Sequence, residues 1–211
     1  MSLRIKRLKL LVVTETEHYG ADISFPDGLM LLRAENTSGK STCLKAIVYA
    51  LGLERMFGPA NQPHLTPAMT SMIEDGDKEF PVLESQVFLE IRNAANNTLT
   101  LQRQVVGPPD RDWRLVTVWE GSVLGESTQI EGKGYYVRDP GAASRESGLH
   151  TRLADFMGWQ LPDVLKYDGT LVPLYMECLL PLFYVEQRHG WSSIQAQHRA
   201  FSKLETSTKK Q

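Results

Sequence analysis

The stretch that decides the fold is residues 34–42, which read AENTSGKST. A short continuous apolar run precedes it at residues 29–32 and predicts a buried strand. After it, apolar residues recur at helical spacing over residues 44–51, and Gly52 follows as a helix stop signal. A strand, a turn containing Gly-Lys-Ser and a helix, in this order, form the context of a phosphate-binding P-loop.

The residue types in this loop suit a chain of phosphates. At the start of the predicted helix, backbone N–H groups and the positive end of the helix dipole favour an anion. Lys40 would bridge the β- and γ-phosphates, Ser41 would ligate Mg²⁺, and Thr42 would bond the α-phosphate. We therefore predict a site for ATP and Mg²⁺ formed by Asn36, Thr37, Ser38, Gly39, Lys40, Ser41 and Thr42.

The loop departs from the usual G-x-x-x-x-G-K-[ST] pattern at its first position, where Ala34 replaces glycine. Alanine costs little at a negative φ but costs stability at a positive φ. The alternative interpretation is a strand–turn–helix joint in which Gly39 makes the turn and Ser41 caps the helix. Because the strand, the Gly-Lys-Ser-Thr core and the amphipathic helix occur together, we favour the nucleotide site.

Composition sets the class of protein. The chain has 211 residues, of which 42% are hydrophobic and 23% charged, as in an ordinary globular domain. The net charge of −2 excludes a strongly basic protein, although a local basic patch could still bind phosphates. Cys43 and Cys178 form neither a disulfide framework nor a metal-binding pattern. With no signal peptide and no membrane-spanning run, we expect a cytoplasmic protein without a membrane partner, with nucleoid or nuclear association as alternatives.

The rest of the chain is mostly β-rich. Segments of alternating polarity, separated by Asn, Gly, Pro or Asp, predict an antiparallel meander over residues 82–137. A helix is expected over residues 149–159, and a long proline-containing connection over residues 56–79. The predicted strands cover residues 3–13, 19–25, 29–32, 82–92, 97–106, 113–123, 129–137 and 182–185.

Residues 28–53, with the loop at their centre, resemble the N-terminal lobe of structural-maintenance-of-chromosomes (SMC) ATPases and of the related RecN- and RecF-type ATPases. The family loop usually reads G-P-N-G-S-G-K-S; the matching residues are Asn36, Ser38, Gly39, Lys40 and Ser41, and the departures are Ala34, Glu35 and Thr37. The resemblance implies an α/β (α+β) fold of the P-loop NTPase type. Such a lobe has a mixed central sheet, an antiparallel β meander and a C-terminal helix leading to a coiled coil.

A second similarity lies at residues 183–187, which read FYVEQ. This apolar segment ending in glutamine resembles the Q-loop of the same family, which implies that Gln187 touches Mg²⁺ and orients the attacking water. Lys40 and Gln187 are therefore the catalytic candidates, and the alternative is that Gln187 merely ends a strand. By this resemblance the lobe covers residues 1–191, and residues 192–211 are the start of a coiled coil or a disordered tail.

Two motifs that the family needs for ATP hydrolysis have no match. The nearest segment to a Walker B strand, residues 87–90, lacks the aspartate, and no serine-glycine signature stands in a suitable place. In the family both motifs lie in a C-terminal lobe, so we expect this chain to be the N-terminal half of an ATPase head that is inactive by itself. The implied partners are its own C-terminal lobe, a second head held through ATP in a homodimer, DNA and a non-SMC protein.

The resemblance implies a role in DNA repair, chromosome organisation or defence against foreign DNA. The alternative is a regulatory or scaffolding module that binds nucleotide without hydrolysing it. A basic group near two tryptophans gives a further candidate contact with nucleic acid, against the favoured interpretation of a solvated sheet face. Its members are Arg103, Arg111 and Arg114, near Trp113 and Trp119.

Overall fold

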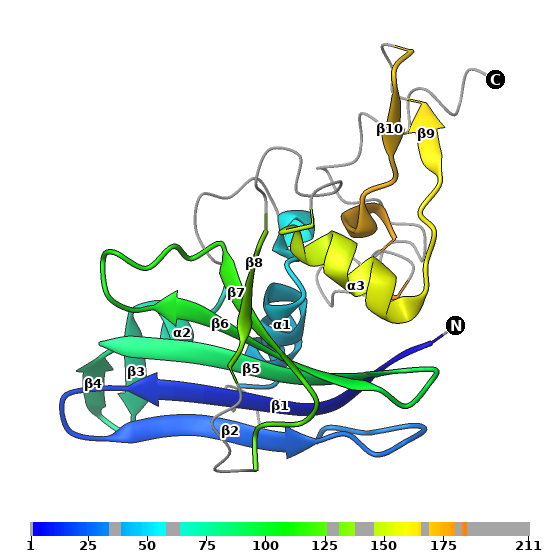
Figure 1. Ribbon diagram of the computed structural model, residues 1–211. Helices are drawn as coiled ribbons and strands as arrows, with labels where there is room; N and C mark the ends of the chain where they lie inside the picture. Colours follow the sequence, from blue (N-terminus) through cyan, green and yellow to red (C-terminus); the bar gives the residue numbers. More distant parts are fainter. Residues whose placement is uncertain are drawn as a thin grey trace, which may run out of the picture.

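The computed structural model describes residues 2–33, 39–57, 64–125, 131–137, 146–165, 169–179 and 183–184. A six-stranded sheet carries most of the described core, with the strand order β2-β1-β5-β6-β7-β8 and every neighbouring pair antiparallel (Figure 1). Its strands are β1 (Leu3–Val13), β2 (His18–Ser24), β5 (Glu84–Asn93), β6 (Thr98–Val106), β7 (Leu115–Glu120) and β8 (Lys133–Tyr136).

Alternation along the strands gives the sheet two different faces. Leu8 and Leu10 of β1 are buried and lie opposite Leu89 and Val87 of β5, on what we call the core face. Lys9 lies between them in sequence and opposite Phe88, on the outer face. Between Ile5 and Arg7, a β-bulge adds one residue to β1 without adding one to β5. The β1 residues on both sides of the bulge therefore still lie opposite β5 residues of the same face.

The helix α1 (Lys40–Ala50) covers the core face and packs against β1, β5 and β6 (Figure 1). Its side chains from Ala46 to Ala50 are all buried, because they fill the space above the apolar residues of the sheet. A second amphipathic helix, α3 (Leu149–Met157), buries Leu149, Leu153 and Phe156 in the same core. The sheet and these helices together position the start of α1.

Shorter elements complete the described structure. The turn η1 (Glu54–Phe57) follows α1, and the short helix α2 (Pro67–Thr70) leads into a hairpin of β3 (Met72–Asp75) and β4 (Lys78–Pro81). A second hairpin, β9 (Asp163–Leu165) with β10 (Leu171–Pro173), leads into the turn η2 (Met176–Cys178). Where it is described, the connection predicted over residues 56–79 contains short elements, while residues 58–63 lie outside the described part of the chain.

A buried ion pair joins α1 to the sheet. Arg103 of β6 and Glu54 of η1 are 0% and 1% exposed, and the Arg103 Nη2 donates to Glu54 Oε1 at 2.8 Å. Arg103 also donates from Nη1 to the Tyr49 carbonyl at 2.6 Å and from Nε to the Trp113 carbonyl at 3.1 Å. These bonds offset part of the cost of burying the guanidinium, and they fix the C-terminal end of α1 over β6.

The broad prediction of an α+β fold with an antiparallel meander is confirmed. The predicted strand over residues 29–32 is wrong, because this segment forms no strand and Leu29 and Leu31 are 99% and 86% exposed. A strand needs a partner for its backbone groups: β1 already pairs on both sides, with β2 and β5, and neither edge strand of the sheet, β2 or β8, pairs with residues 29–32. In place of the expected mixed central sheet, the strands of the described sheet all pair antiparallel, and the parallel contact is an isolated bridge between Tyr136 and Gly148.

Candidate functional site

The predicted loop ends at Gly39, which immediately precedes α1. Gly39 has φ +82°, a left-handed conformation that an L-side chain adopts only with strain. A Cβ atom built on Gly39 would meet nothing within 4 Å, so the backbone angle alone explains the glycine. The Gly39 carbonyl accepts the Cys43 N–H at 3.0 Å and begins the helical ladder. The predictions of a turn at Gly39 and of Lys40 at a helix N-terminus are confirmed.

The first turn of α1 has the electrostatic character that an anion requires. No side chain caps the helix, and the first turn contains no acidic residue. The first N–H groups of any α-helix lack intrahelical acceptors, and they lie at the positive end of the helix dipole. Lys40 is half-buried and Ser41 is exposed, so this turn adds an ammonium group and an accessible hydroxyl to that dipole.

Thr42, which is predicted to bond the α-phosphate, has a partner within the chain. Its side chain is buried, and its hydroxyl lies 2.8 Å from the hydroxyl of Thr66, the residue that precedes α2. This hydrogen bond joins α1 to α2 and engages the group that we had assigned to the α-phosphate. Sequence reasoning missed Thr66 as a residue of this region; its only signal is the Thr-Pro pair, which is typical of a helix start.

The other end of α1 is held by groups from distant parts of the chain. The Tyr49 hydroxyl donates to the Gln104 carbonyl at 2.6 Å, and Arg103 binds the Tyr49 carbonyl. His150 of α3 places its Nε2 3.2 Å from the Leu51 carbonyl. Basic side chains near the last carbonyls stabilise a helix C-terminus. The position of Lys40 and Ser41 therefore depends on a helix anchored at its far end.

The remaining predicted site residues lie outside the described part of the chain. These are Asn36, Thr37 and Ser38 of the loop and Gln187 of the Q-loop candidate, together with the expected coiled coil beyond residue 191. Of the strand predicted over residues 182–185, only Phe183 and Tyr184 are described, and neither is in a strand. The described site thus consists of Gly39, Lys40 and Ser41 at the start of α1.

Glu90 ends the segment that is nearest in sequence to a Walker B strand, and it lies on the face of the sheet opposite α1. It is opposite Arg7 in the β1–β5 register, on the outer face, whereas α1 covers the core face. Its carboxylate accepts a hydrogen bond from the Ser122 hydroxyl at 2.5 Å. The Glu90 carboxylate therefore cannot act on a ligand at the start of α1.

The three arginines that the sequence groups as a candidate nucleic-acid contact lie in different environments in the structure. Arg103 is fully buried, so both the solvated-face interpretation and the nucleic-acid interpretation are wrong for this residue. Arg111 donates to Gln102 Oε1 at 3.2 Å, and Arg114 pairs with Asp112 at 2.7 Å. The sequence places these arginines close together, but only the fold reveals that one of them faces the core.

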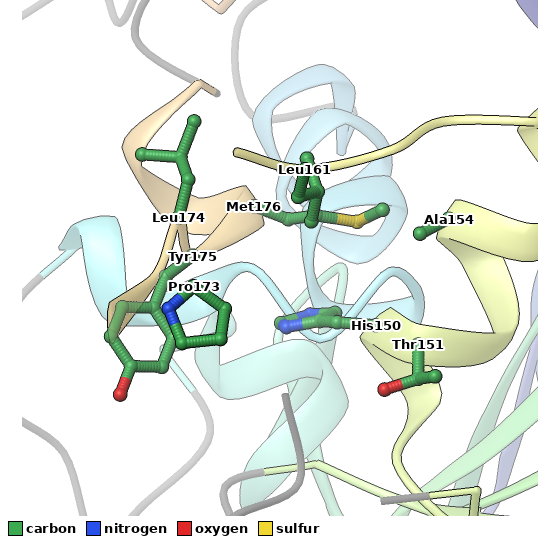
Figure 2. A pocket seen from close by; sticks show the side chains of 8 residues that line it. All are labelled: His150, Thr151, Ala154, Leu161, Pro173, Leu174, Tyr175 and Met176. Carbon is green, nitrogen blue, oxygen red and sulfur yellow. The ribbon is translucent and has the colours of Figure 1, made fainter. Parts of the chain in front are cut away.

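A small cleft of ≈ 180 Å³ lies between α3 and the segment that runs from β10 into η2 (Figure 2). Figure 2 shows Pro173 and Tyr175 on one side and Thr151 on the other, with the side chains of His150 and Met176 between them. The lining is mainly apolar, and the His150 ring bonds the end of α1. In the described ranges, no group of three or more His, Cys, Asp or Glu side chains could hold a metal ion.

Comparison with known proteins gives no family assignment. No protein-family model matches the chain, and no curated protein matches its sequence. None of the helices within the described ranges is both long and apolar enough to span a lipid bilayer.

Proposed function

We propose that this chain is the ATP-binding half of an SMC-like ATPase head, which dimerises around ATP and acts on DNA in repair, chromosome organisation or defence against foreign DNA. One observation carries the nucleotide part of the proposal. The sequence Gly-Lys-Ser stands at the N-terminus of a helix anchored on a sheet, with Gly39 in the left-handed conformation. This is where a P-loop requires its glycine and its lysine.

The residues at the start of α1 fit a nucleotide with its metal ion. Lys40 would contact the terminal phosphates, and the exposed Ser41 hydroxyl would be a ligand for Mg²⁺. When bound, Mg²⁺ would neutralise phosphate charge. The Thr42 hydroxyl contacts Thr66, so Thr42 also holds α1 against α2, and its bond to the α-phosphate stays a prediction.

The anchoring of α1 supports a preorganised site. Tyr49 and Leu51, near the end of the helix, are held by Arg103 and His150, which come from β6 and α3. A helix fixed at its far end keeps its N–H groups in place when an anion arrives, so little ordering entropy is lost on binding. This rigidity is what a phosphate site at the opposite end of the helix needs.

The apolar segment before the loop supports a second lobe as partner. Leu29 and Leu31 are almost fully exposed, although four consecutive apolar residues normally form a buried strand. We propose that a strand of the chain's own C-terminal lobe pairs with residues 29–32 and covers these side chains. The same lobe would supply the acidic residue and the signature motif that hydrolysis requires.

A non-hydrolysing nucleotide-binding module is the second candidate, and the position of Glu90 favours it. Residues 87–90, the nearest segment to a Walker B strand, present the Glu90 carboxylate to the face opposite α1. Without an acidic residue near the terminal phosphate, a protein can bind ATP and change partners without turning it over. The two candidates share the nucleotide site and differ in whether a second lobe completes it.

Titration with ATP, with and without Mg²⁺, tests the proposal. Lys40→Ala should weaken ATP binding about ten- to a hundredfold, because it removes a charged hydrogen bond to phosphate. Lys45→Ala is the matched control, since Lys45 lies on the same helix and has its ammonium 5.7 Å from the Phe57 ring centroid. Ser41→Ala should weaken binding only when Mg²⁺ is present.

Circular dichroism should show the same helix content for both lysine variants and the wild type. Equal ATP affinities of Lys40→Ala and Lys45→Ala would show that the Gly-Lys-Ser sequence is only a turn and a helix start. ATP turnover by the chain alone, lost in Lys40→Ala, would contradict the second-lobe part of the proposal and leave the nucleotide site standing.

A further inference from the structure

Three basic side chains converge on one carboxylate at the end of the sheet where β1 begins. Arg4 Nη1, Lys6 Nζ and Arg92 Nη2 lie 3.1, 3.4 and 2.9 Å from Asp27 Oδ1. Asp27 belongs to the turn after β2, whereas the three cations come from β1 and β5. We call these four residues the basic corner.

The basic corner carries an excess positive charge. The hydrogen bonds from Arg92, Arg4 and Lys6 lower the pKa of Asp27 to about 2, so its carboxylate is ionised at neutral pH. One negative charge then faces three positive charges, although the whole chain has a net charge of −2. Because like charges repel, such a cluster is better balanced when an anion binds beside it.

The positive charge continues along the outer face of β1. Arg7 and Lys9 lie two residues apart on this face, opposite Glu90 and Phe88 of β5. The Asp22 carboxylate accepts two hydrogen bonds from Arg7 at 2.7 and 2.8 Å, and the Lys9 charge also lowers the pKa of Asp22. This region therefore contains five basic groups and three carboxylates. The basic groups are Arg4, Lys6, Arg7, Lys9 and Arg92, and the carboxylates are Asp22, Asp27 and Glu90.

The basic corner is accessible to a large ligand. The side chains of Arg4 and Asp27 are 54% and 52% exposed. Beside them lies a depression of ≈ 380 Å³, whose lining includes Arg4, Asp27, Phe25 and Met30. The depression is open and polar rather than an enclosed pocket, which suits an extended polyanion better than a small molecule.

We propose that the basic corner and the outer face of β1 form a contact surface for the phosphodiester backbone of DNA. Along a strand, the distance from Arg4 to Lys9 is about 16 Å, and each DNA strand presents one phosphate about every 3.4 Å of helix axis. The row of basic groups can therefore face several successive phosphates. Two of the three cations in the corner are arginines, whose planar guanidinium groups bind phosphate oxygens in pairs.

This surface is separate from the start of α1, since it uses none of the Gly-Lys-Ser residues. The inference rests on the proposed action on DNA and names the side chains that make the contact. Asp27 then competes with DNA, because its carboxylate binds the same basic side chains that a phosphate would bind. Removal of the Asp27 carboxylate should therefore change DNA affinity, which is not expected if the ion pairs only stabilise the fold.

Fluorescence anisotropy of a short labelled DNA duplex, titrated with the full chain at several salt concentrations, tests the surface. Arg4→Gln should weaken binding about two- to fivefold at low salt. It should also reduce the slope of log affinity against log salt by about 0.9, as the loss of one phosphate contact does. Asp27→Asn should instead tighten binding about two- to fivefold, because it removes the competing carboxylate.

Arg152→Gln is the matched control, because this substitution removes the same charge from a different part of the surface. Arg152 lies on α3 and pairs with Glu120 of β7. The Arg152→Gln variant should leave affinity and slope near the wild-type values. Equal effects of Arg4→Gln and Arg152→Gln would contradict the proposed contact surface, and so would unchanged or weaker binding by folded Asp27→Asn. Neither result would contradict the proposed action on DNA. No duplex binding by the wild type would overturn both. Displacement of the duplex by polyglutamate at equal charge would indicate an acidic protein ligand and also overturn the inference.

Discussion

The Arg103 guanidinium lies over the Tyr49 ring, with its central carbon 3.9 Å from the ring centroid, and donates to the carbonyl of the same tyrosine at 2.6 Å. One side chain thus contacts both the aromatic face and the backbone of a residue in the last turn of α1. The stacking supplies an electrostatic attraction in a buried site, and the hydrogen bond satisfies a carbonyl near the end of the helix. The third contact, with Glu54, makes this arginine the main polar link between the helix and the sheet.

The first prediction concerns this link. Arg103→Met should lower the free energy of unfolding by about 3–5 kcal/mol, because it leaves the buried Glu54 carboxylate without its guanidinium partner. The double variant Arg103→Met, Glu54→Leu should lose less than Arg103→Met alone, since replacing both charges by apolar groups removes the desolvation cost. Urea denaturation of the three proteins measures both effects. A double variant less stable than Arg103→Met would contradict this explanation, because it would show that Glu54 stabilises the fold even without its guanidinium partner.

The second prediction concerns the hydroxyl pair that joins α1 and α2. Thr42→Val and Thr66→Val should each lower the free energy of unfolding by about 0.5–1.5 kcal/mol. The double variant should lose less than the two single losses together, because both remove the same hydrogen bond. ATP affinity should change less in Thr42→Val than in Ser41→Ala. A larger effect of Thr42→Val than of Ser41→Ala on ATP affinity would favour the α-phosphate role predicted for Thr42.

The third prediction concerns the pH dependence of the Asp27 cluster. The pKa of Asp27 is lowered in the folded protein, so its contribution to stability is complete above the unfolded pKa of about 4. The contribution is lost as the pH falls from about 4 toward 2, where the folded carboxyl becomes protonated. The difference in unfolding free energy between wild type and Asp27→Asn should therefore shrink over this range. Parallel denaturation curves at several acidic pH values measure it, and a difference that does not change with pH would contradict the cluster.

Much of the fold follows from local patterns. The alternation over residues 3–13 matches β1 to the residue, and the helical spacing after the loop places α1. Gly39 was predictable because a left-handed turn before a helix has a strong preference for glycine. These features depend on neighbours in sequence, and for that reason sequence reasoning found them.

The wrong predictions concern properties that depend on distant residues. The apolar run at 29–32 has the composition of a strand, but a strand also needs a neighbour that pairs with it, and none of the six strands of the sheet does so. The burial of Arg103 arises from the approach of Glu54 and Tyr49, which a β-strand pattern does not reveal. The Thr42–Thr66 contact depends on how α2 folds back onto α1. Composition alone could not supply any of these three-dimensional relationships.

The pairing of β1 with β5 has a consequence for the order in which the protein can fold. Val13 pairs with Glu84 and Leu3 with Asn93, so the first strand acquires this partner only after the whole loop and helix have been synthesised. Closing such a long segment of chain is entropically costly and slow compared with forming the β1–β2 hairpin. The surface beneath α1 is therefore incomplete when the helix leaves the ribosome. A nascent chain that ends before residue 84 would carry the Gly-Lys-Ser sequence on a helix with little to pack against.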